Sequence, residues 1–187
     1  MTWEIEAKMK LVDRAVLEQR LVQIGAQHSE LVFEVNTFFD TPDGQLKRRD
    51  EGLRLRVNEW HEGQSTVVIT HKGPCRESPL KVRSETELEV MDSIVAGKLL
   101  EQLGYEPKLS FEKHRQRWRI DDCLVELDTI PYLGDYVEVE GASEQIVMEM
   151  RSRLDLQDLP LIRASYAALL SDYAREHGIE ASAIRFS

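Results

Sequence analysis

The sequence predicts an α+β fold in which eight mainly antiparallel strands are long enough to close as a barrel, with helices packed on the outside. Three observations predict it. Eight segments are typical of strands, most of them with apolar and polar residues alternating at a period of two. A capped helical segment follows the first and the fifth of them, and the stretch from Ser143 to His177 has a helical pattern. We expect a single domain over residues 1–187, with the barrel and two crossing helices in 1–141 and further helices in 142–187.

The first half of the chain supplies one unit of this pattern. Residues 3–11 alternate strictly and predict a strand. Asp13 has the position of an N-cap for a helix that Gly25 ends. Further strands are predicted at about 30–39, 53–57 and 65–70, with a turn at 41–44 between the first two of them.

The second half repeats the order of elements. A strand at 83–90 precedes a helix that begins after Asp92 and ends at Gly104, and strands follow at 109–120, 123–129 and 136–141. Asp13 and Asp92 are 79 residues apart, and so are Gly25 and Gly104. This constant spacing predicts a duplicated strand–helix–strand unit. The C-terminal helical stretch is expected to break around 154–160.

Composition excludes several classes of protein. Lys and Arg number 24 against 34 Asp and Glu, a formal charge of −10, which argues against coating nucleic acid. No apolar run approaches the ~18 residues of a membrane span, and the N-terminus lacks the pattern of a signal peptide. The two cysteines form no CxxC pair, which argues against disulfides and thiolate zinc. We therefore expect a cytoplasmic protein without nucleic-acid or membrane partners.

The charged faces of the predicted strands separate by sign. Arg54 and Arg56 share one face, 113–119 carries four basic residues on alternate positions, and 85–89, 126–128 and 138–140 carry acidic rows. The ordinary arrangement is a one-sided sheet whose charged face meets water. Because a solvated face usually mixes signs, and because helices can cover the apolar faces only from outside, a closed barrel with inward charges is the alternative that we favour. A polyphosphate with divalent cations would satisfy both signs.

Several short motifs resemble one family. Glu4-Ile5-Glu6-Ala7-Lys8 matches the ExExK signature of the CYTH, or triphosphate tunnel metalloenzyme, superfamily. Supporting strings follow in family order to about residue 141: Phe38-Phe39-Asp40, Leu53-Arg54-Leu55-Arg56, Thr70-His71-Lys72-Gly73-Pro74, Arg83-Ser84-Glu85, Lys113-His114-Arg115, Leu127-Asp128 and Leu133 to Glu140. Ser165 to Leu170 resembles the terminal helix of the bacterial class IV adenylate cyclase branch.

The resemblance implies an eight-stranded triphosphate tunnel that uses Mg²⁺ or Mn²⁺. The implied metal ligands are Glu6 and Glu138, helped by Glu4, Glu85 and Glu140. The residues implied to hold the triphosphate are Lys8, Arg54, Arg56, Lys72, Lys113 and Arg115, with Arg83 a weaker candidate beside a proline-containing loop. Asp128 would lie beside the metals or orient a basic residue. The residues implied to be catalytic are Lys8, Arg54, Lys72, Lys113, Arg115 and Asp128. Glu34 and Asn36 depart from the Gln-x-Asp-x-Tyr pattern of many relatives.

The resemblance implies an enzyme and leaves its reaction open. The favoured prediction is an adenylate cyclase, a phosphorus–oxygen lyase that converts ATP to cyclic AMP and pyrophosphate. An inorganic or thiamine triphosphatase on the same tunnel is the alternative, because both reactions would use nearly the same residues. A non-catalytic module that binds nucleotide or polyphosphate is the third. A nucleoside or inorganic triphosphate is the expected partner, and the resemblance also implies a homodimer.

Overall fold

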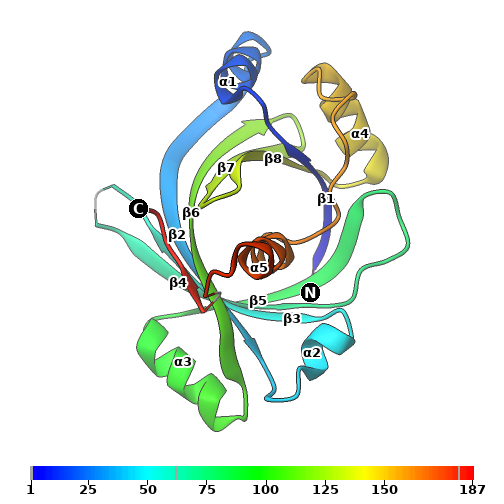
Figure 1. The fold of residues 1–187 in the computed structure, drawn as a ribbon. Coiled ribbons are helices and arrows are strands. Elements are labelled where there is room, and N and C mark those ends of the chain that lie inside the picture. Colours follow the sequence, from blue (N-terminus) through cyan, green and yellow to red (C-terminus); the bar gives the residue numbers. More distant parts are fainter. Residues whose placement is uncertain (1, 62, 181) are drawn as a thin grey trace.

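Eight antiparallel strands close into a barrel in the computed structural model, which describes residues 2–61, 63–180 and 182–187 (Figure 1). The strands are β1 (Thr2–Lys10), β2 (Gln27–Asp40), β3 (Gly52–Glu59), β4 (Ser65–Lys72), β5 (Lys81–Val90), β6 (Glu106–Ile120), β7 (Cys123–Ile130) and β8 (Gly134–Glu140). Their order is β2-β3-β4-β5-β1-β8-β7-β6, and pairing of β2 with β6 closes the ring. The predicted α+β barrel is confirmed.

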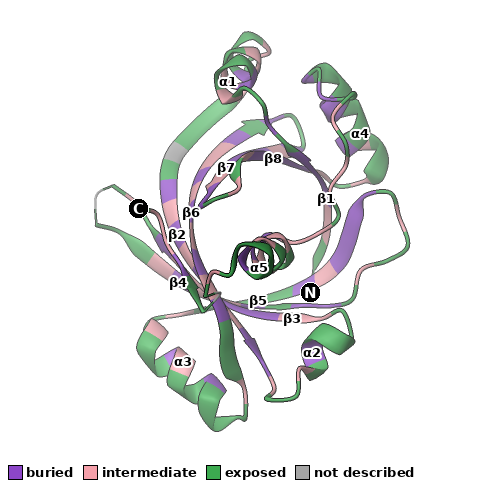
Figure 2. Ribbon diagram, viewed as in Figure 1, coloured by how far each residue is buried: buried purple, intermediate pink, exposed green. Residues whose placement is uncertain are grey.

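Helices lie outside the barrel wall and cover its apolar face. α5 (Tyr166–His177) lies instead across an open end of the barrel, and the helices outside the wall are α1 (Arg14–Gln23), α3 (Ser93–Gln102) and α4 (Glu144–Arg153). Leu21 of α1 and Val147 of α4 pack on Val125 and Val137 in one cluster, and α3 packs on β3 and β4 in another. Figure 2 shows the inner sides of these helices buried and their outer sides exposed. None of the described helices is long and apolar enough to cross a membrane.

The duplication expected from the sequence is present in the structure. β1, α1 and β2 begin at residues 2, 14 and 27, and β5, α3 and β6 begin at 81, 93 and 106, each 79 residues later. Asp13 accepts a hydrogen bond from the backbone N–H of Val16, and Asp92 caps α3 in the same way. Gly25 and Gly104 follow the two helices with φ of +79° and +91°, a conformation that favours glycine.

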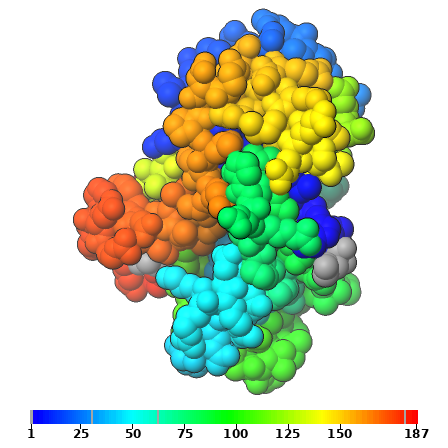
Figure 3. Space-filling model, turned by 90° about the vertical axis from the view of Figure 1, so that its right-hand side faces the viewer, coloured from blue at the N-terminus to red at the C-terminus, as the bar shows by residue number. Residues whose placement is uncertain are grey.

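The non-helical break in the C-terminal part is longer than the sequence predicted. Residues 154–165 are non-helical, a longer interval than 154–160, and Ser165 then caps α5 by accepting from the N–H of Ala168. The interval crosses the outside of the barrel, where the N–H of Ile162 donates to the carbonyl of Lys8 at 2.8 Å and Arg163 donates to the carbonyl of Arg76 at 3.0 Å. Figure 3 shows this segment (orange) beside the chain around Arg76 (green). It carries α5 across an open end of the barrel.

Two short elements were not predicted. β9 (Ala183–Ile184) pairs in parallel with β6, and α2 (Gln45–Arg48) follows the turn at 41–44. Asp40 at the end of β2 holds α2 in place, because its carboxylate accepts from the backbone N–H groups of Thr41, Leu46 and Lys47 at 2.7, 2.9 and 3.0 Å. Burial opposes ionisation, but these donors lower the pKa of Asp40 below its ordinary value.

We expect Asp40→Ala to lower the free energy of unfolding by about 2–3 kcal/mol, because it leaves buried backbone donors unsatisfied. The lowered pKa means that this stabilisation is present above about pH 4 and is lost as Asp40 protonates at lower pH. Urea unfolding at pH 7 and pH 3 measures both effects. Asp43→Ala, an exposed change in the same turn, should alter stability much less. Equal stability of the Asp40 variant and the unmodified protein at pH 7 would contradict this role for Asp40.

Candidate functional site

The barrel encloses a cavity of about 1160 Å³ lined by charged side chains of opposite sign. β3 and β6 contribute a basic wall, formed by Arg54, Arg56, Lys113, Arg115 and Arg117. β1, β5, β7 and β8 contribute carboxylates, which are Glu4, Glu6, Glu85, Glu87, Glu126, Glu138 and Glu140, together with Lys8, Lys81 and Arg83. Lys72 of β4 also lines the cavity. All the basic and acidic residues predicted for the site except Asp128 therefore line one cavity.

Cross-strand ion pairs compensate the rows of like charge. Lys81 Nζ lies 2.7 Å from Glu6, and Lys8 Nζ lies 3.1 Å from Glu138 and 3.5 Å from Glu6. Burial would raise the pKa of Glu138, but Lys8 and Arg115 hold it well below the ordinary value. Burial likewise opposes the charge of Lys81, whose pKa is nevertheless raised by Glu6 and Glu4. The interior thus holds ionised groups as pairs rather than as repelling rows.

Asp128 is fully buried and orients two of the predicted phosphate-binding residues. Arg115 Nε donates to Asp128 Oδ1 at 2.7 Å, and Lys113 Nζ lies 3.4 Å from Oδ2. Burial disfavours the charged guanidinium, yet Asp128 and Glu126 raise the pKa of Arg115 well above its ordinary value. The resemblance implied either that Asp128 lies beside the metals or that it orients a basic residue, and these contacts support the second role.

Arg54, Arg56 and Lys72 lie side by side on β3 and β4. Arg54 donates to Thr70 Oγ1 at 3.1 Å, and its Nε has no partner in the described structure. Burial, together with Arg54, lowers the pKa of Arg56 to about 10, so it stays charged at neutral pH. Lys72 contacts Glu85 and lies 3.3 Å from Glu4. Burial lowers the pKa of Lys72 despite these carboxylates.

Arg83 lines the cavity but its donors are engaged elsewhere. Its Nε donates to the carbonyl of Gly73 at 2.8 Å, and its Nη2 donates to the carbonyl of Asp50 at 2.7 Å. These bonds tie the loop after β4 to the start of β3. The contacts therefore favour a structural role for Arg83 over phosphate binding.

The carboxylates around Glu140 have the donor chemistry that Mg²⁺ and Mn²⁺ prefer. Burial, together with the nearby carboxylates of Glu126, Glu4, Glu6 and Glu85, raises the pKa of Glu140 to about 7. Within the described residues, no three ligating side chains already form a metal-binding group. Mg²⁺ commonly binds one or two carboxylates and completes its shell with water and substrate phosphate, so the residues fit such a cation.

The predicted site set left out four charged residues of this interior, which are Glu34, Lys81, Arg117 and Glu126. Glu34, Lys81 and Glu126 form ion pairs with predicted residues, and Arg117 pairs with Glu34 and Glu126. Alternation placed Arg117 and Glu126 on charged faces without assigning them to the site, and it could have identified Lys81, which lies two positions before Arg83 on β5. Glu34 carried no such signal, since three of its four basic partners come from β6, which meets β2 only when the barrel closes.

Tyr166 is a further residue that was missed, at the start of α5. Its ring lies 4.3 Å from Lys8 Nζ and 5.4 Å from Lys113 Nζ, and it packs on Tyr136. The hydroxyl is buried without a partner among the described side chains, and burial, with Asp128 and Glu138 nearby, raises its pKa well above the ordinary value. Because Lys8 also donates to the carbonyl of Ala164 at 3.1 Å, α5 is fixed to the cationic end of the cavity.

The chain is a closed antiparallel barrel whose interior carries paired acidic and basic walls. Residues 3–152 match the family model described as the CYTH domain, and the chain belongs to the CYTH family. Members of this family act on nucleoside or inorganic triphosphates and generally depend on a divalent metal.

Individual relatives agree with the family assignment. The chain is 26% identical over 161 residues to adenylate cyclase CyaB of Aeromonas hydrophila, covering 84% of this chain and 78% of that protein. It is 25% identical to MJ0240 of Methanocaldococcus jannaschii over 89% of this chain and 97% of the relative. The solved structure of PH1819 from Pyrococcus horikoshii superposes with a TM-score of 0.80 at 23% identity over 91% of this chain and 99% of the other. The structure of HpAC1 from Hippeastrum, described as having a dominant triphosphatase activity, superposes with a TM-score of 0.65 at 18% identity. The superposition covers 95% of this chain and 97% of HpAC1.

We expect Glu140→Gln to stabilise the metal-free protein at pH 8 by about 1–2 kcal/mol, a value reduced for the partial solvent access of this side chain. The folded-state pKa of about 7 lies above the ordinary 4.5, so the unmodified protein loses stability as pH rises between these values. The variant should lack this loss.

Chemical denaturation in chelator-containing buffer at pH 4.5 and pH 8 tests the expectation for Glu140. Glu89→Gln removes one exposed charge from β5 and serves as the matched control. A Glu140 variant that is no more stable than the unmodified protein at pH 8 would show that carboxylate repulsion does not act at this position.

Proposed function

We propose that this chain is a divalent-metal-dependent adenylate cyclase that converts ATP to cyclic AMP and pyrophosphate within the barrel. The observation that carries the proposal is the cavity itself, in which five basic side chains of β3 and β6 face the carboxylates of β1 and β8. A polyphosphate and its cation are the complementary ligand for such a pair of walls. Similarity to a relative named adenylate cyclase supports the choice of reaction.

The cavity also has an uncharged part that suits the nucleoside. Phe38, Leu109 and Phe111 line it next to the basic wall, and the rings of Phe38 and Phe111 stack with centroids 6.1 Å apart. Tyr166 of α5 and its N-cap residue Ser165 also line the cavity. An inorganic triphosphate would leave this apolar surface unused, whereas an adenosine group can contact it.

In this proposal the basic side chains bind the phosphates and the carboxylates bind the cation. Lys113 and Arg115, held by Asp128, would bind the triphosphate, and Lys8, Arg54, Arg56 and Lys72 would extend this binding along the cavity. Glu6, Glu138 and Glu140, with Glu4 and Glu85 beside them, would hold Mg²⁺ or Mn²⁺. The cation, when bound, supplies neutralisation of phosphate charge. The remaining rate acceleration would come from two effects of the protein. It would position the ribose hydroxyl against the α-phosphate, and its Lys and Arg side chains would stabilise the leaving pyrophosphate.

Hydrolysis of a triphosphate is the second candidate. HpAC1, which shares this fold, is described as having a dominant triphosphatase activity. The same side chains of this chain would hold the triphosphate, with water instead of the ribose hydroxyl as the nucleophile.

Product analysis separates the two reactions. We expect purified protein incubated with ATP and Mn²⁺ or Mg²⁺ to release cyclic AMP and pyrophosphate in equal amounts, and chelator to abolish this turnover. Inorganic triphosphate and thiamine triphosphate, incubated in parallel, report hydrolysis. Orthophosphate without cyclic AMP would replace the cyclase by a triphosphatase, and metal-free binding without any turnover would indicate a binding module.

We expect Lys113→Met to weaken binding of inorganic triphosphate about 10- to 100-fold, the usual effect of losing a charge-assisted contact. Calorimetric titration measures the dissociation constant, and circular dichroism confirms that the variant is folded. Lys98→Met removes an equal charge from the exposed side of α3 and should bind as the unmodified protein does. Unchanged affinity in a folded Lys113 variant would remove this residue from the phosphate-binding set.

A further inference from the structure

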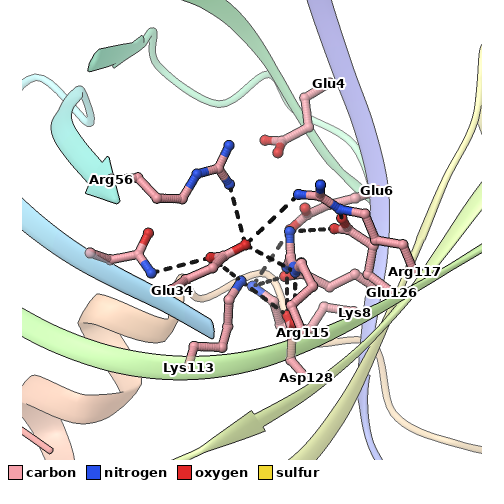
Figure 4. A network of polar contacts seen from close by, with 12 residues as sticks. Glu4, Glu6, Lys8, Glu34, Arg56, Lys113, Arg115, Arg117, Glu126 and Asp128 are labelled. Atoms are coloured by element: carbon pink, nitrogen blue, oxygen red, sulfur yellow. Dashed lines mark hydrogen bonds and ion pairs between the residues drawn. The ribbon is translucent and has the colours of Figure 1, made fainter. Parts of the chain in front are cut away.

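Glu34 lies on β2 between the two basic strands of the cavity. Its neighbours in register are Asn58 on β3 and Lys113 on β6. The side chain has no exposed surface. Figure 4 shows its carboxylate at the centre of a group of basic side chains that approach it from several directions.

The carboxylate of Glu34 is shared among four cations. Lys113 Nζ lies 3.1 Å away, Arg56 lies 3.7 Å away, and Arg115 and Arg117 each lie 3.8 Å away. Burial would raise the pKa of Glu34, but Lys113, Arg115 and Arg56 hold it well below the ordinary value, so the group is an anion at neutral pH.

The four cations stand between Glu34 and the cavity. All of them line the cavity, whereas Glu34 is completely buried behind them. Besides Glu34, Arg115 contacts Glu126, Asp128 and Glu138 at 2.5 Å each. Arg117 contacts Glu126 at 2.9 Å, and Lys113 lies 3.4 Å from Asp128. Arg56 has only the half-exposed Glu87, at 3.9 Å, besides Glu34 in the described structure.

We propose that Glu34 limits the affinity of the basic wall for polyphosphate by supplying a fixed negative charge behind the cations that face the ligand. Each cation is attracted both to Glu34 and to a phosphate in the cavity, and the two anions repel one another through the poorly screened interior. Glu34 therefore stabilises the ligand-free cavity and weakens binding of a polyphosphate. This inference rests on the proposed function, because it takes the cavity as the triphosphate site.

Limited affinity has a consequence for substrate choice. A basic wall without Glu34 would hold any polyphosphate tightly, including a pyrophosphate product. With Glu34 in place, binding depends more on the cation and on the part of the substrate beyond the phosphates. Glu34 is thus a specificity-determining residue that does not touch the ligand.

Substitution of Glu34 tests the inference with a binding measurement in chelator-containing buffer. We expect Glu34→Gln to bind inorganic triphosphate at least tenfold more tightly than the unmodified protein, and to unfold at a lower temperature without ligand. Addition of triphosphate should then raise its melting temperature by more than it raises that of the unmodified protein. Glu112→Gln removes an equal charge from the outer face of β6 and should leave the affinity unchanged within twofold.

The other outcomes decide against the inference. A folded Glu34→Gln protein with equal affinity would show that the buried charge does not act on the ligand, and one with weaker affinity would show that Glu34 positions the cations. If this variant does not fold, Glu34→Asp serves in its place, because the shorter side chain withdraws the carboxylate from the cations. It should still bind inorganic triphosphate more tightly than the unmodified protein, and equal or weaker binding overturns the inference. Failure of the unmodified protein to bind inorganic triphosphate or ATP would instead overturn the proposed function, and this inference with it.

Discussion

Charge compensation inside a closed barrel is the constraint on which the rest of this structure depends. A charge removed from water is tolerated only when it is paired or ligated, because the interior screens poorly and solvates weakly. The barrel turns two sets of strand residues inward, so every inward Lys or Arg needs a carboxylate within reach. Lys8 between Glu6 and Glu138, and Arg115 between Asp128 and Glu126, show how the strands meet this need.

The duplicated unit supplies the frame for this pairing, and the two copies differ in charge at corresponding positions. Glu34 corresponds to Lys113 and Lys8 to Glu87, each pair 79 residues apart. Glu4 corresponds in the same way to Arg83. Two identical copies would place like charges side by side on neighbouring strands, because Glu4 pairs in register with Arg83 and Glu34 with Lys113. Opposite signs at these positions pair the charges instead, whereas Glu6 and Glu85 keep the same sign in both copies.

Local rules made most of the frame predictable from the sequence. Alternation with a period of two identified most of the barrel strands, and the Asp caps with their following glycines fixed α1 and α3. The one-turn helix α2 could not be predicted, since it depends on Asp40 reaching across a turn to its backbone. β9 is two residues long and pairs only because α5 returns the chain to β6.

The candidate site was predictable only in part, for the same physical reason. Residues within a recognisable motif, such as Glu6 or Lys113, could be assigned from the chain itself. Glu34 and Tyr166 acquire their surroundings from strands and a helix that are remote in sequence. Lys113 is 79 residues from Glu34 and Lys8 is 158 residues from Tyr166, so only closure of the barrel and return of α5 bring these side chains together.

If the cavity binds a polyphosphate and its cation as proposed, its paired charges imply that the two bind together more favourably than either binds alone. A polyphosphate that attracts Lys8 draws it from Glu138 and leaves that carboxylate buried without its partner. A divalent cation that attracts Glu138 leaves Lys8 in the same position. When both enter, phosphate compensates the lysine and the cation compensates the carboxylate, so neither charge is left unpaired. Under the proposed function, the salt bridges that stabilise the ligand-free barrel would therefore couple the binding of substrate and metal.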